Sequence, residues 1–358
     1  MSPAVCRTRE EVAHAVSTLR AQGRPVALVP TMGALHAGHA ALVRRARRDG
    51  AEPVVSIFVN PLQFGPGEDF ARYPRDEAGD LGVAAGAGAS VVYLPAAGQL
   101  VPEPPRTVVA VPALMGRMDA LSRPGHFEGV AMIVVRLLAH VAPDSAYFGE
   151  KDAQQLAVVR RVVRDLQLPV RIVGVATVRE PDGLAMSSRN AYLPDRERTQ
   201  ALSLSRALRQ GEARIAAGER DPATVADAMA QALAAAPGVT PEYAVAVDPD
   251  DLAAPDRLLG RTLLAVAARV GPARLIDNLR LWVPVLGVPT PLVDDPDGAD
   301  AAQRQARVQA QAEAAARRRR SAADLAFDAA AAHAVKGTPD VDPATLQALL
   351  DRIENGGD

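Results

Sequence analysis

The stretch that decides the fold is Val-Ala-Leu-Val-Pro-Thr-Met-Gly-Ala-Leu-His-Ala-Gly-His at residues 26–39, followed by Ala-Ala-Leu-Val-Arg-Arg-Ala-Arg-Arg at residues 40–48. Residues 26–29 form a short apolar run that is typical of a buried parallel strand, and the Pro and Gly after it mark a turn. The apolar residues of 40–48 recur at helical spacing, so the pattern predicts a helix that begins near Gly38.

Two histidines stand at the start of this predicted helix. His36 and His39 are three residues apart, beside backbone N–H groups that have no partner within the helix. The positive end of a helix dipole at such a site favours a phosphate chain, and Gly33 and Gly38 leave room for its approach. Taken alone, the motif could also be a polar turn or half of a metal site.

Further apolar runs of strand length alternate with helical patterns along the chain. Helices are expected at residues 9–22 and 130–141, and strands at residues 53–59, 91–94 and 170–178. This alternation predicts a Rossmann-like doubly wound parallel sheet, in which ligands bind beyond the carboxyl ends of the strands. The Pro-rich residues 95–105 are expected to form a surface loop.

Polar residues follow two of these elements at positions where a ligand could bind. Asn60 and Gln63 come directly after the strand at 53–59, although Asn-Pro is also an ordinary turn former. Arg123 and His126 end a loop rich in Arg, Pro and Gly, just before the helix at 130–141. Such a loop suits a flap over a bound anion, and its plainer interpretation is a connection before a helix.

A second strand end runs into a helix at Phe-Gly-Glu-Lys-Asp-Ala-Gln-Gln, residues 148–155. Lys151 can reach a phosphate as a point charge, and Asp152 and Gln155 share one face of the first helical turn. Lysine occurs elsewhere only at Lys336, which suggests a site that needs a compact ammonium group. A solvated helix start with Asp152 near the N-cap is the alternative.

Two hydroxyl groups precede an arginine in Met-Ser-Ser-Arg, residues 186–189. Ser187 and Ser188 can donate hydrogen bonds, and Arg189 can bind two oxygens at once, so the segment suits a triphosphate. Its plainer interpretation is a loop between domains with N-capping serines.

The chain changes character after residue 193, where Ala-rich helical patterns precede three short strands at 243–247, 263–267 and 273–278. We expect three parts: a Rossmann-like domain at residues 1–178, a smaller α+β cap domain at 179–286, and an Ala/Arg-rich extension at 287–358. The extension is expected to be a solvated helix or disordered, with no part in catalysis.

Charge and cysteine content bear on which partners and which compartment the sequence favours. The chain has 358 residues, a formal net charge of −2 and a single cysteine, Cys6. The charge gives no general electrostatic reason to expect nucleic acid or a membrane as partner, and one thiol cannot form an internal disulfide. Without a secretory h-region or a long apolar run, cytoplasmic localisation is the expectation.

The three motifs together resemble one family. The motif at residues 36–39 resembles the His-x-Gly-His signature of an adenylyl-transferring α/β superfamily. The longer motif at residues 30–39 is similar to that of the pantothenate synthetases (pantoate-beta-alanine ligases). Residues 148–155 and 186–189 resemble this family's nucleotide-binding segment and phosphate-clamping loop, in the family's order. The resemblance covers roughly residues 26–281.

The resemblance implies an ATP-dependent ligase that joins (R)-pantoate to β-alanine through a pantoyl adenylate, giving pantothenate, AMP and pyrophosphate. It implies a catalytic group of His36, His39 and Lys151, with His39 as the proton donor to the leaving group. The implied ATP site comprises Met32, Gly33, Ala34, Leu35, His36, Ala37, Gly38, His39, Gly149, Glu150, Lys151, Asp152, Val178, Met186, Ser187, Ser188 and Arg189. The implied pantoate and β-alanine site comprises Asn60, Gln63, Arg123, His126 and Gln155.

The resemblance also implies Mg²⁺, small-molecule substrates and a homodimer. Where the family shows two consecutive acidic residues, this chain has Gly79 and Asp80, so Asp80 is only a weak candidate for the metal. Two other functions stay open: another nucleotidyltransferase of the same superfamily, and a nucleotide-sensing or RNA-binding protein without turnover. The first would need extra cations for a phosphate-bearing substrate, and the second has support only in Gly79 and the basic run at residues 317–320.

Overall fold

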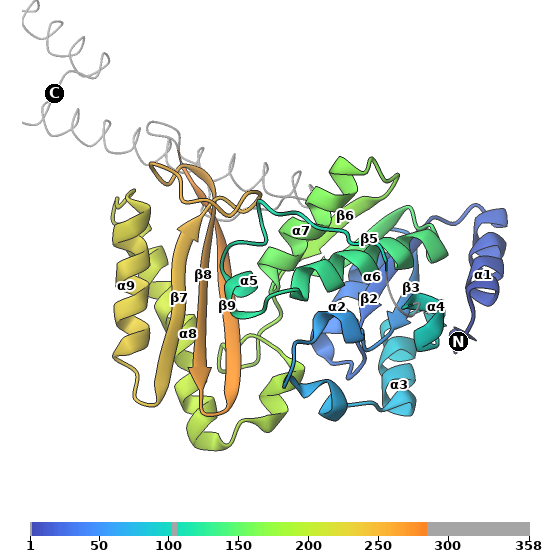
Figure 1. Cartoon of the computed structure of the whole chain (residues 1–358), viewed down its shortest axis with the longest axis horizontal. Coiled ribbons are helices and arrows are strands. Elements are labelled where there is room, and N and C mark those ends of the chain that lie inside the picture. The colour runs from blue at the N-terminus through green and yellow to red at the C-terminus, as the bar shows by residue number, and fades with distance from the viewer. Residues whose placement is uncertain (1, 102–105, 285–358) are drawn as a thin grey trace, which may run out of the picture. The chain divides into compact units, whose positions relative to one another are not determined.

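Six parallel strands form the central sheet of the computed structural model, which describes residues 2–101 and 106–284 (Figure 1). The strands lie in the order β1-β4-β3-β2-β5-β6. Their bounds are β1 Ala4–Cys6, β2 Val26–Thr31, β3 Glu52–Ile57, β4 Val91–Tyr93, β5 Ser145–Gly149 and β6 Arg171–Val175. The chain runs outward from β2 to β4 and then crosses over to β5, so the strand order reverses between β2 and β5. A doubly wound sheet opens its ligand crevice at that point.

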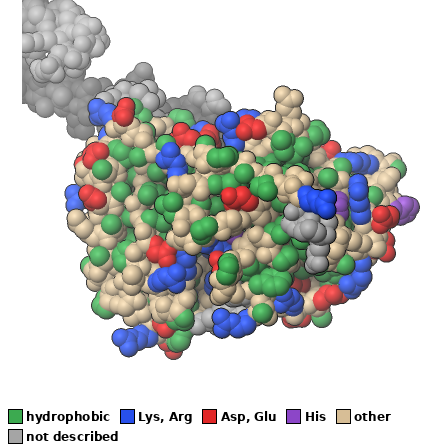
Figure 2. Space-filling model, viewed as in Figure 1, with side chains coloured by type: hydrophobic (Ala, Val, Ile, Leu, Met, Phe, Trp, Pro, Cys, Tyr) green, Lys and Arg blue, Asp and Glu red, His purple; other side chains and the backbone are tan. Residues whose placement is uncertain are grey.

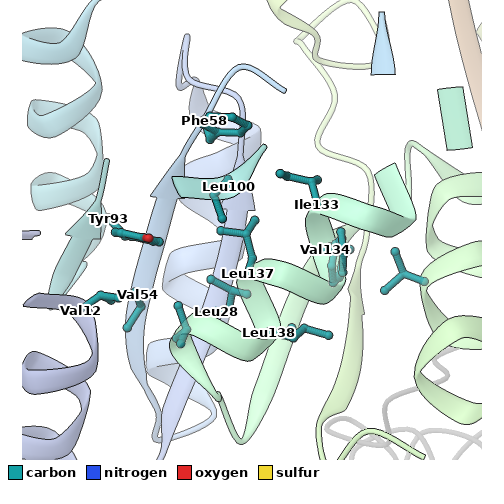
Figure 3. Packing of buried hydrophobic residues seen from close by; sticks show 14 of the residues in the cluster. Val12, Leu28, Val54, Phe58, Tyr93, Leu100, Ile133, Val134, Leu137 and Leu138 are labelled. Carbon is teal, nitrogen blue, oxygen red and sulfur yellow. The ribbon is translucent and has the colours of Figure 1, made fainter. Parts of the chain in front are cut away.

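Helices cover both faces of this sheet because β2 alternates its side chains between them. Val26 and Leu28 face one cluster, which includes residues of the helices α1, α6 and α7. Ala27 and Val29 face the other, which includes residues of α2 and α3. Figure 3 shows the first cluster, in which Leu137 and Leu138 of α6 pack near Leu28 and Val54. These helices are α1 Arg9–Ala21, α2 Ala37–Arg48, α3 Glu77–Ala87, α6 His126–Val141 and α7 Ala153–Asp165.

Short helical segments lie in the connections. They are η1 Pro61–Gln63, η2 Asp69–Arg72, α4 Ala97–Leu100, α5 Asp119–Ser122 and η3 Ser188–Tyr192. The expectation of a surface loop at residues 95–105 is wrong for its first half, because α4 forms there and Leu100 is fully buried in the cluster of Figure 3. Residues 102–105 lie outside the described part.

A second, smaller sheet of three antiparallel strands follows, in the order β7-β8-β9. Its strands are β7 Val239–Val247, β8 Gly260–Val270 and β9 Ala273–Val283, and the helices α8 Asp195–Ala216 and α9 Pro222–Ala234 precede it. One face of β8 packs with residues of α8 and α9, and the other packs with residues of α6 and α7. The α+β character expected after residue 193 is therefore confirmed, and the smaller sheet is packed between two pairs of helices.

Several predicted bounds differ from the observed ones. Helix α6 begins at His126 rather than at residue 130, and β6 ends at Val175 rather than at residue 178. The antiparallel strands are longer than predicted, because an eleven-pair register between β8 and β9 extends both. The described residues on either side of the predicted boundary at 178/179 belong to one compact unit, and the predicted extension at 287–358 lies outside the described residues.

Two features bear on interactions with nucleic acids and membranes: the charge on the surface and the apolar character of the helices. On the face shown in Figure 2, basic and acidic side chains are interspersed, as the net charge of −2 leads one to expect. No helix within residues 2–101 and 106–284 combines the length and apolar character needed to cross a membrane.

Candidate active site

A pocket opens at the carboxyl ends of β2 and β5, where the strand order reverses. It brings together most of the residues predicted from the sequence. These lining residues are Met32, His36, Gly38, His39, Asn60, Gln63, Arg123, His126, Gly149, Lys151, Asp152, Gln155, Val178, Met186, Ser187, Ser188 and Arg189. Gly33, Ala34, Leu35, Ala37, Asp80 and Glu150 were also predicted but do not line it.

The two histidines cap helix α2 with their own rings. His36 is the N-cap residue, and its Nδ1 accepts a hydrogen bond from the Gly38 N–H at 3.1 Å. His39 Nδ1 accepts from the His36 N–H at 3.3 Å, which completes a reciprocal capping box. An imidazole that accepts at Nδ1 carries its proton at Nε2, so each ring keeps one N–H donor.

Burial makes this pair of histidines neutral in the free protein. Burial, with the neighbouring His36 as the second cause, lowers the pKa of His39 to about 3, and burial also lowers the pKa of His36. A neutral imidazole has no second proton to release at neutral pH. In the free protein His39 therefore offers its Nε2–H as a hydrogen-bond donor, and its role as the proton donor to the leaving group stays a prediction.

Asp80 of α3 holds the turn that precedes α2. Its Oδ1 accepts from the Leu35 N–H at 2.6 Å and its Oδ2 accepts from the Ala34 N–H at 3.1 Å. Gly33 has a φ of +85°, and a Cβ there would lie 2.8 Å from Asp80 Oδ2, so both the conformation and the space require glycine. Predicted residues 33–35 thus shape the pocket without lining it.

The part of the chain that the structure describes offers Mg²⁺ no cage of protein side chains. Among the described residues, no group of three or more His, Cys, Asp or Glu side chains could hold a metal ion. The Asp80 carboxylate is already engaged by two backbone amides. Mg²⁺ commonly binds through substrate phosphates and water with few protein ligands, and this site fits only that arrangement.

Asn60 fixes the orientation of the Gln63 amide. Asn60 Nδ2 donates to Gln63 Oε1 at 3.0 Å and to the Gly129 carbonyl at 3.1 Å, while its Oδ1 accepts from the Leu62 N–H. With its oxygen turned to Asn60, Gln63 keeps its Nε2 hydrogens for Met32 Sδ and the pocket. Asn60, which is only 1% exposed, holds Gln63 in place.

Arg123 and His126 hold the same segment from the other side. His126 Nδ1 donates to the Gln63 carbonyl at 2.8 Å, so its Nε2 accepts from Arg123 Nη1 at 3.1 Å. Burial, together with the charge of Arg123, lowers the pKa of His126 to about 4. Arg123 also forms a two-pronged ion pair with Glu68, with distances of 2.9 and 2.6 Å. Glu68 was not predicted from the sequence, because no local motif marks a partner 55 residues away.

Lys151 lies at the turn between β5 and α7, with Nζ 3.5 Å from Asp152 Oδ1. Gln155 lines the pocket one turn into α7. Its neighbour Gln154 points elsewhere: it is buried, accepts from the Asp119 N–H and donates to the carbonyls of Leu114 and Arg117. The two glutamines that are adjacent in sequence thus have different environments, as the helical period requires.

The Met-Ser-Ser-Arg segment also lines the pocket and contacts the first turn of helix α2. Met186 Sδ accepts from the Gly38 N–H at 3.2 Å, and Ser187 Oγ accepts from the Arg189 N–H at 3.3 Å as the N-cap of η3. Asn190, which the sequence analysis did not select, ties this segment to Glu180 and to the Ala185 carbonyl. A hydroxyl pair and a guanidinium therefore line the same pocket as the two histidines.

Comparison with known proteins places this geometry among ligases. A sequence model of the family described as pantoate-beta-alanine ligase matches residues 4–280. A pantothenate synthetase of Moorella thermoacetica is 48% identical over 277 residues, which are 77% of this chain and 98% of the relative. One from Rhizorhabdus wittichii is 51% identical over 276 residues, covering 77% and 97% of the two chains.

Solved structures agree with these sequence matches. The crystal structure of a pantothenate synthetase from Thermus thermophilus has a TM-score of 0.72 and 46% identity, covering 77% of this chain and 98% of its own. A pantoate-beta-alanine ligase from Francisella tularensis, complexed with beta-gamma ATP and beta-alanine, has a TM-score of 0.62 and 28% identity. It covers 77% of this chain and 97% of its own.

Proposed function

The chain belongs to the pantoate-beta-alanine ligase family, and on that premise we propose how this pocket joins pantoate to β-alanine at the expense of ATP. The observation that carries the proposal is that residues of three sequence motifs line one pocket. The α2 N-terminus with His36 and His39, the turn with Lys151, and the segment of Ser187 to Arg189 come from distant parts of the chain.

The reaction has two steps. A pantoate carboxylate oxygen attacks the α-phosphorus of ATP, the bond to the bridging oxygen breaks, and pyrophosphate leaves with that electron pair. The β-alanine amine then attacks the acyl carbon of pantoyl adenylate, AMP departs from that carbon, and the amine loses a proton to solvent. Because a carboxylate is ionised at neutral pH, the protein needs no base to activate it.

Negative charge develops on the α-phosphate and the departing pyrophosphate, so fixed donors and cations are the main requirement. The Nε2–H groups of His36 and His39 and the backbone N–H groups of the first α2 turn supply neutral donors. Lys151 and Arg189 supply positive charge, and the hydroxyls of Ser187 and Ser188 supply further donors.

Two amides are assigned to pantoate. Gln63 presents Nε2 to the pocket because Asn60 holds its oxygen, so we assign it to a pantoate hydroxyl or carboxylate oxygen. Gln155 lines the same pocket from α7. Arg123 and His126 hold the Gln63 backbone, and their proposed role is to position it.

Mg²⁺ enters this proposal as part of the nucleotide substrate. The absence of a three-ligand cluster among the described residues favours an ion carried by the ATP phosphates and completed by water. Its chemistry there is to neutralise phosphate charge.

The pocket and the family match disfavour the two alternatives. A transferase that acts on a phosphate-bearing substrate would need cations at the second substrate site, where Gln63 and Gln155 are neutral amides and the charge of Arg123 is paired with Glu68. An RNA-binding function would depend on the basic run at residues 317–320, which lies outside the described residues.

A product assay with omission controls tests the proposed function. Full-length protein with MgATP, pantoate and β-alanine is expected to form AMP and pantothenate in equal amounts, as resolved by chromatography. Replacing pantoate by a phosphorylated acceptor should give no product. AMP formation that does not depend on pantoate, or transfer to the phosphorylated acceptor, would contradict the proposal.

We also propose that the enzyme is a cytoplasmic homodimer. The lone cysteine, Cys6, is free and buried, so the fold depends on no disulfide. Light scattering of the full-length protein should give twice the chain mass of 37.5 kDa. A mass equal to one chain would contradict the dimer.

A further inference from the structure

Strand β9 of the smaller sheet reaches the turn that carries Lys151. Asn278 Nδ2 donates to the carbonyl oxygens of Glu150 at 2.9 Å and Lys151 at 2.7 Å. Asn278 is only 5% exposed, so both bonds lie away from solvent. One side chain therefore binds two consecutive carbonyls of the turn between β5 and α7, which would otherwise need other partners.

A second contact anchors the same turn. Arg280 Nη1 lies 2.7 Å from Glu150 Oε1, and the two side chains are 8% and 13% exposed. Glu150 does not line the pocket, although the sequence resemblance assigns it to ATP. Its carboxylate instead connects the Lys151 turn to β9.

The neighbouring residue on β9, Asp277, binds the chain just before the Ser187-Ser188-Arg189 segment. Asp277 forms a two-pronged ion pair with Arg179, with distances of 2.7 and 2.9 Å, and its own side chain is 3% exposed. Arg179 also donates to the Asn278 carbonyl at 3.2 Å and to the Gly183 carbonyl at 3.1 Å. These bonds fix the start of the turn that leads into Ser187.

We propose that Asp277 and Asn278 are positioning residues, which set the spacing between Lys151 and the Ser187-Ser188-Arg189 segment. The inference rests on the proposed function, because it assumes that these two segments bind one nucleotide. Loops at ligand sites take their geometry from a rigid scaffold, and here two adjacent residues of one strand supply it to both loops. A misplacement of about 1 Å can cost roughly 10²-fold in rate, so such a scaffold matters for the reaction.

A double-mutant cycle separates positioning from general stability. The measured rate is single-turnover pyrophosphate release from MgATP with pantoate. We expect Asn278→Ala to slow it by about 10- to 100-fold in the otherwise wild-type protein. In a Lys151→Ala background, the same substitution should change the rate by less than about 3-fold, because the group that it positions is missing.

The controls keep this outcome interpretable. Arg220→Met removes another side chain whose Nη1 bridges two carbonyls of the smaller domain, those of Ile215 and Glu219, at 2.8 and 2.7 Å. It should leave the rate unchanged. If Asn278→Ala does not fold, Asn278→Asp keeps the shape but lacks the donor, and Arg280→Met removes the neighbouring anchor. Circular dichroism melting verifies folding of each variant.

Several results would overturn the inference. One is a rate within 2-fold of wild type for folded Asn278→Ala and Asn278→Asp. Another is a rate loss from Asn278→Ala that is as large in the Lys151→Ala background as in the otherwise wild-type protein, because the two residues would then act independently. If wild-type protein binds ATP but releases no pyrophosphate, the proposed function fails instead. The same cycle is then measured by calorimetric ATP binding, where lack of coupling between Asn278 and Lys151 would overturn the positioning role.

Discussion

At the scale of single residues, the pocket combines neutral donors with a few cations. His36 and His39 contribute N–H groups without charge, because burial lowers both pKa values and each Nδ1 already accepts a backbone hydrogen bond. Lys151 and Arg189 contribute the positive charge. Such a mixture can stabilise the negative charge that develops on the phosphates in the transition state. It does so without binding the ground-state carboxylate of pantoate too tightly.

Lys151 is expected to act as a point charge on the phosphates. Replacing it by alanine should reduce the rate of pantoate-dependent pyrophosphate release by about 10²–10³-fold, the usual cost of removing one contact to developing charge. Lys151→Arg should recover only part of this loss, because the larger planar guanidinium does not fit a site built for an ammonium group. Near-normal single-turnover release from Lys151→Ala would refute the assigned role.

His126 gives the free energy of unfolding a measurable pH dependence. Its pKa in the folded protein is lowered from 6.5 to about 4, so below pH 6.5 the unfolded chain binds a proton that the folded chain does not. Stability is therefore lost as the pH falls from 6.5 towards 4, by up to about 1.4 kcal/mol per pH unit for one such group.

Urea unfolding at several pH values measures that slope. His126→Asn should flatten the slope between pH 6.5 and 4.5, whereas His14→Gln should not, because His14 is exposed on α1. An unchanged slope in His126→Asn would show that the folded protein protonates His126 without penalty.

The site residues that were predicted from sequence are those whose chemistry is local to a motif. Short motifs contain His36, His39, Lys151 and Ser187. The strand-turn-helix context of these motifs can be inferred from periodicity. Glu68, in contrast, acquires its role only through an ion pair with a residue 55 positions away. No local pattern encodes such a pairing.

At the scale of elements, helix α6 and the short η1 segment form one packed unit. A Cβ at Gly129 would lie 2.2 Å from the Leu62 carbonyl oxygen and 2.8 Å from the Gln63 nitrogen. Only glycine therefore allows η1 to approach the helix. From the sequence, Arg123 and His126 were placed in a loop before a helix at 130–141, whereas the observed helix begins at His126.

Gly129→Ala should displace Gln63 and destabilise the fold. Overpacking of this kind costs about 1–3 kcal/mol in the free energy of unfolding, and the KM for pantoate should rise because the Gln63 amide moves. Gly86→Ala in α3 is the matched control, since its Cβ would meet nothing within 4 Å. It should be neutral or stabilising by up to about 1 kcal/mol. An unaltered KM in Gly129→Ala would exclude the packing argument.

At the scale of the whole molecule, the matched family accounts for most of the chain but not for all of it. The family model ends at residue 280, and the relative from Moorella thermoacetica covers 77% of this chain while 98% of its own length is matched. The alternation of strand and helix patterns predicts the class of the parallel sheet, but the packing of the smaller sheet against α6 and α7 depends on contacts between distant segments. Periodicity carries no information about such contacts.

Removing the residues after 286 is expected to leave catalysis intact. A protein truncated there should retain pantoate-dependent AMP formation within about 3-fold, because every proposed site residue lies between Met32 and Arg280. Binding of a labelled RNA to the full-length and truncated proteins tests the alternative role for the basic run. A truncated protein that folds but is inactive would show that the account omits a necessary part.

The central claim is that this pocket forms pantoyl adenylate before any amine reacts. The most direct measurement is a rapid-quench single turnover of full-length protein with MgATP and pantoate, without β-alanine, followed by addition of β-alanine. We predict one equivalent of pyrophosphate per active site in the first phase and AMP release only in the second. Pyrophosphate release that requires β-alanine, or none from protein that binds ATP, would contradict the claim.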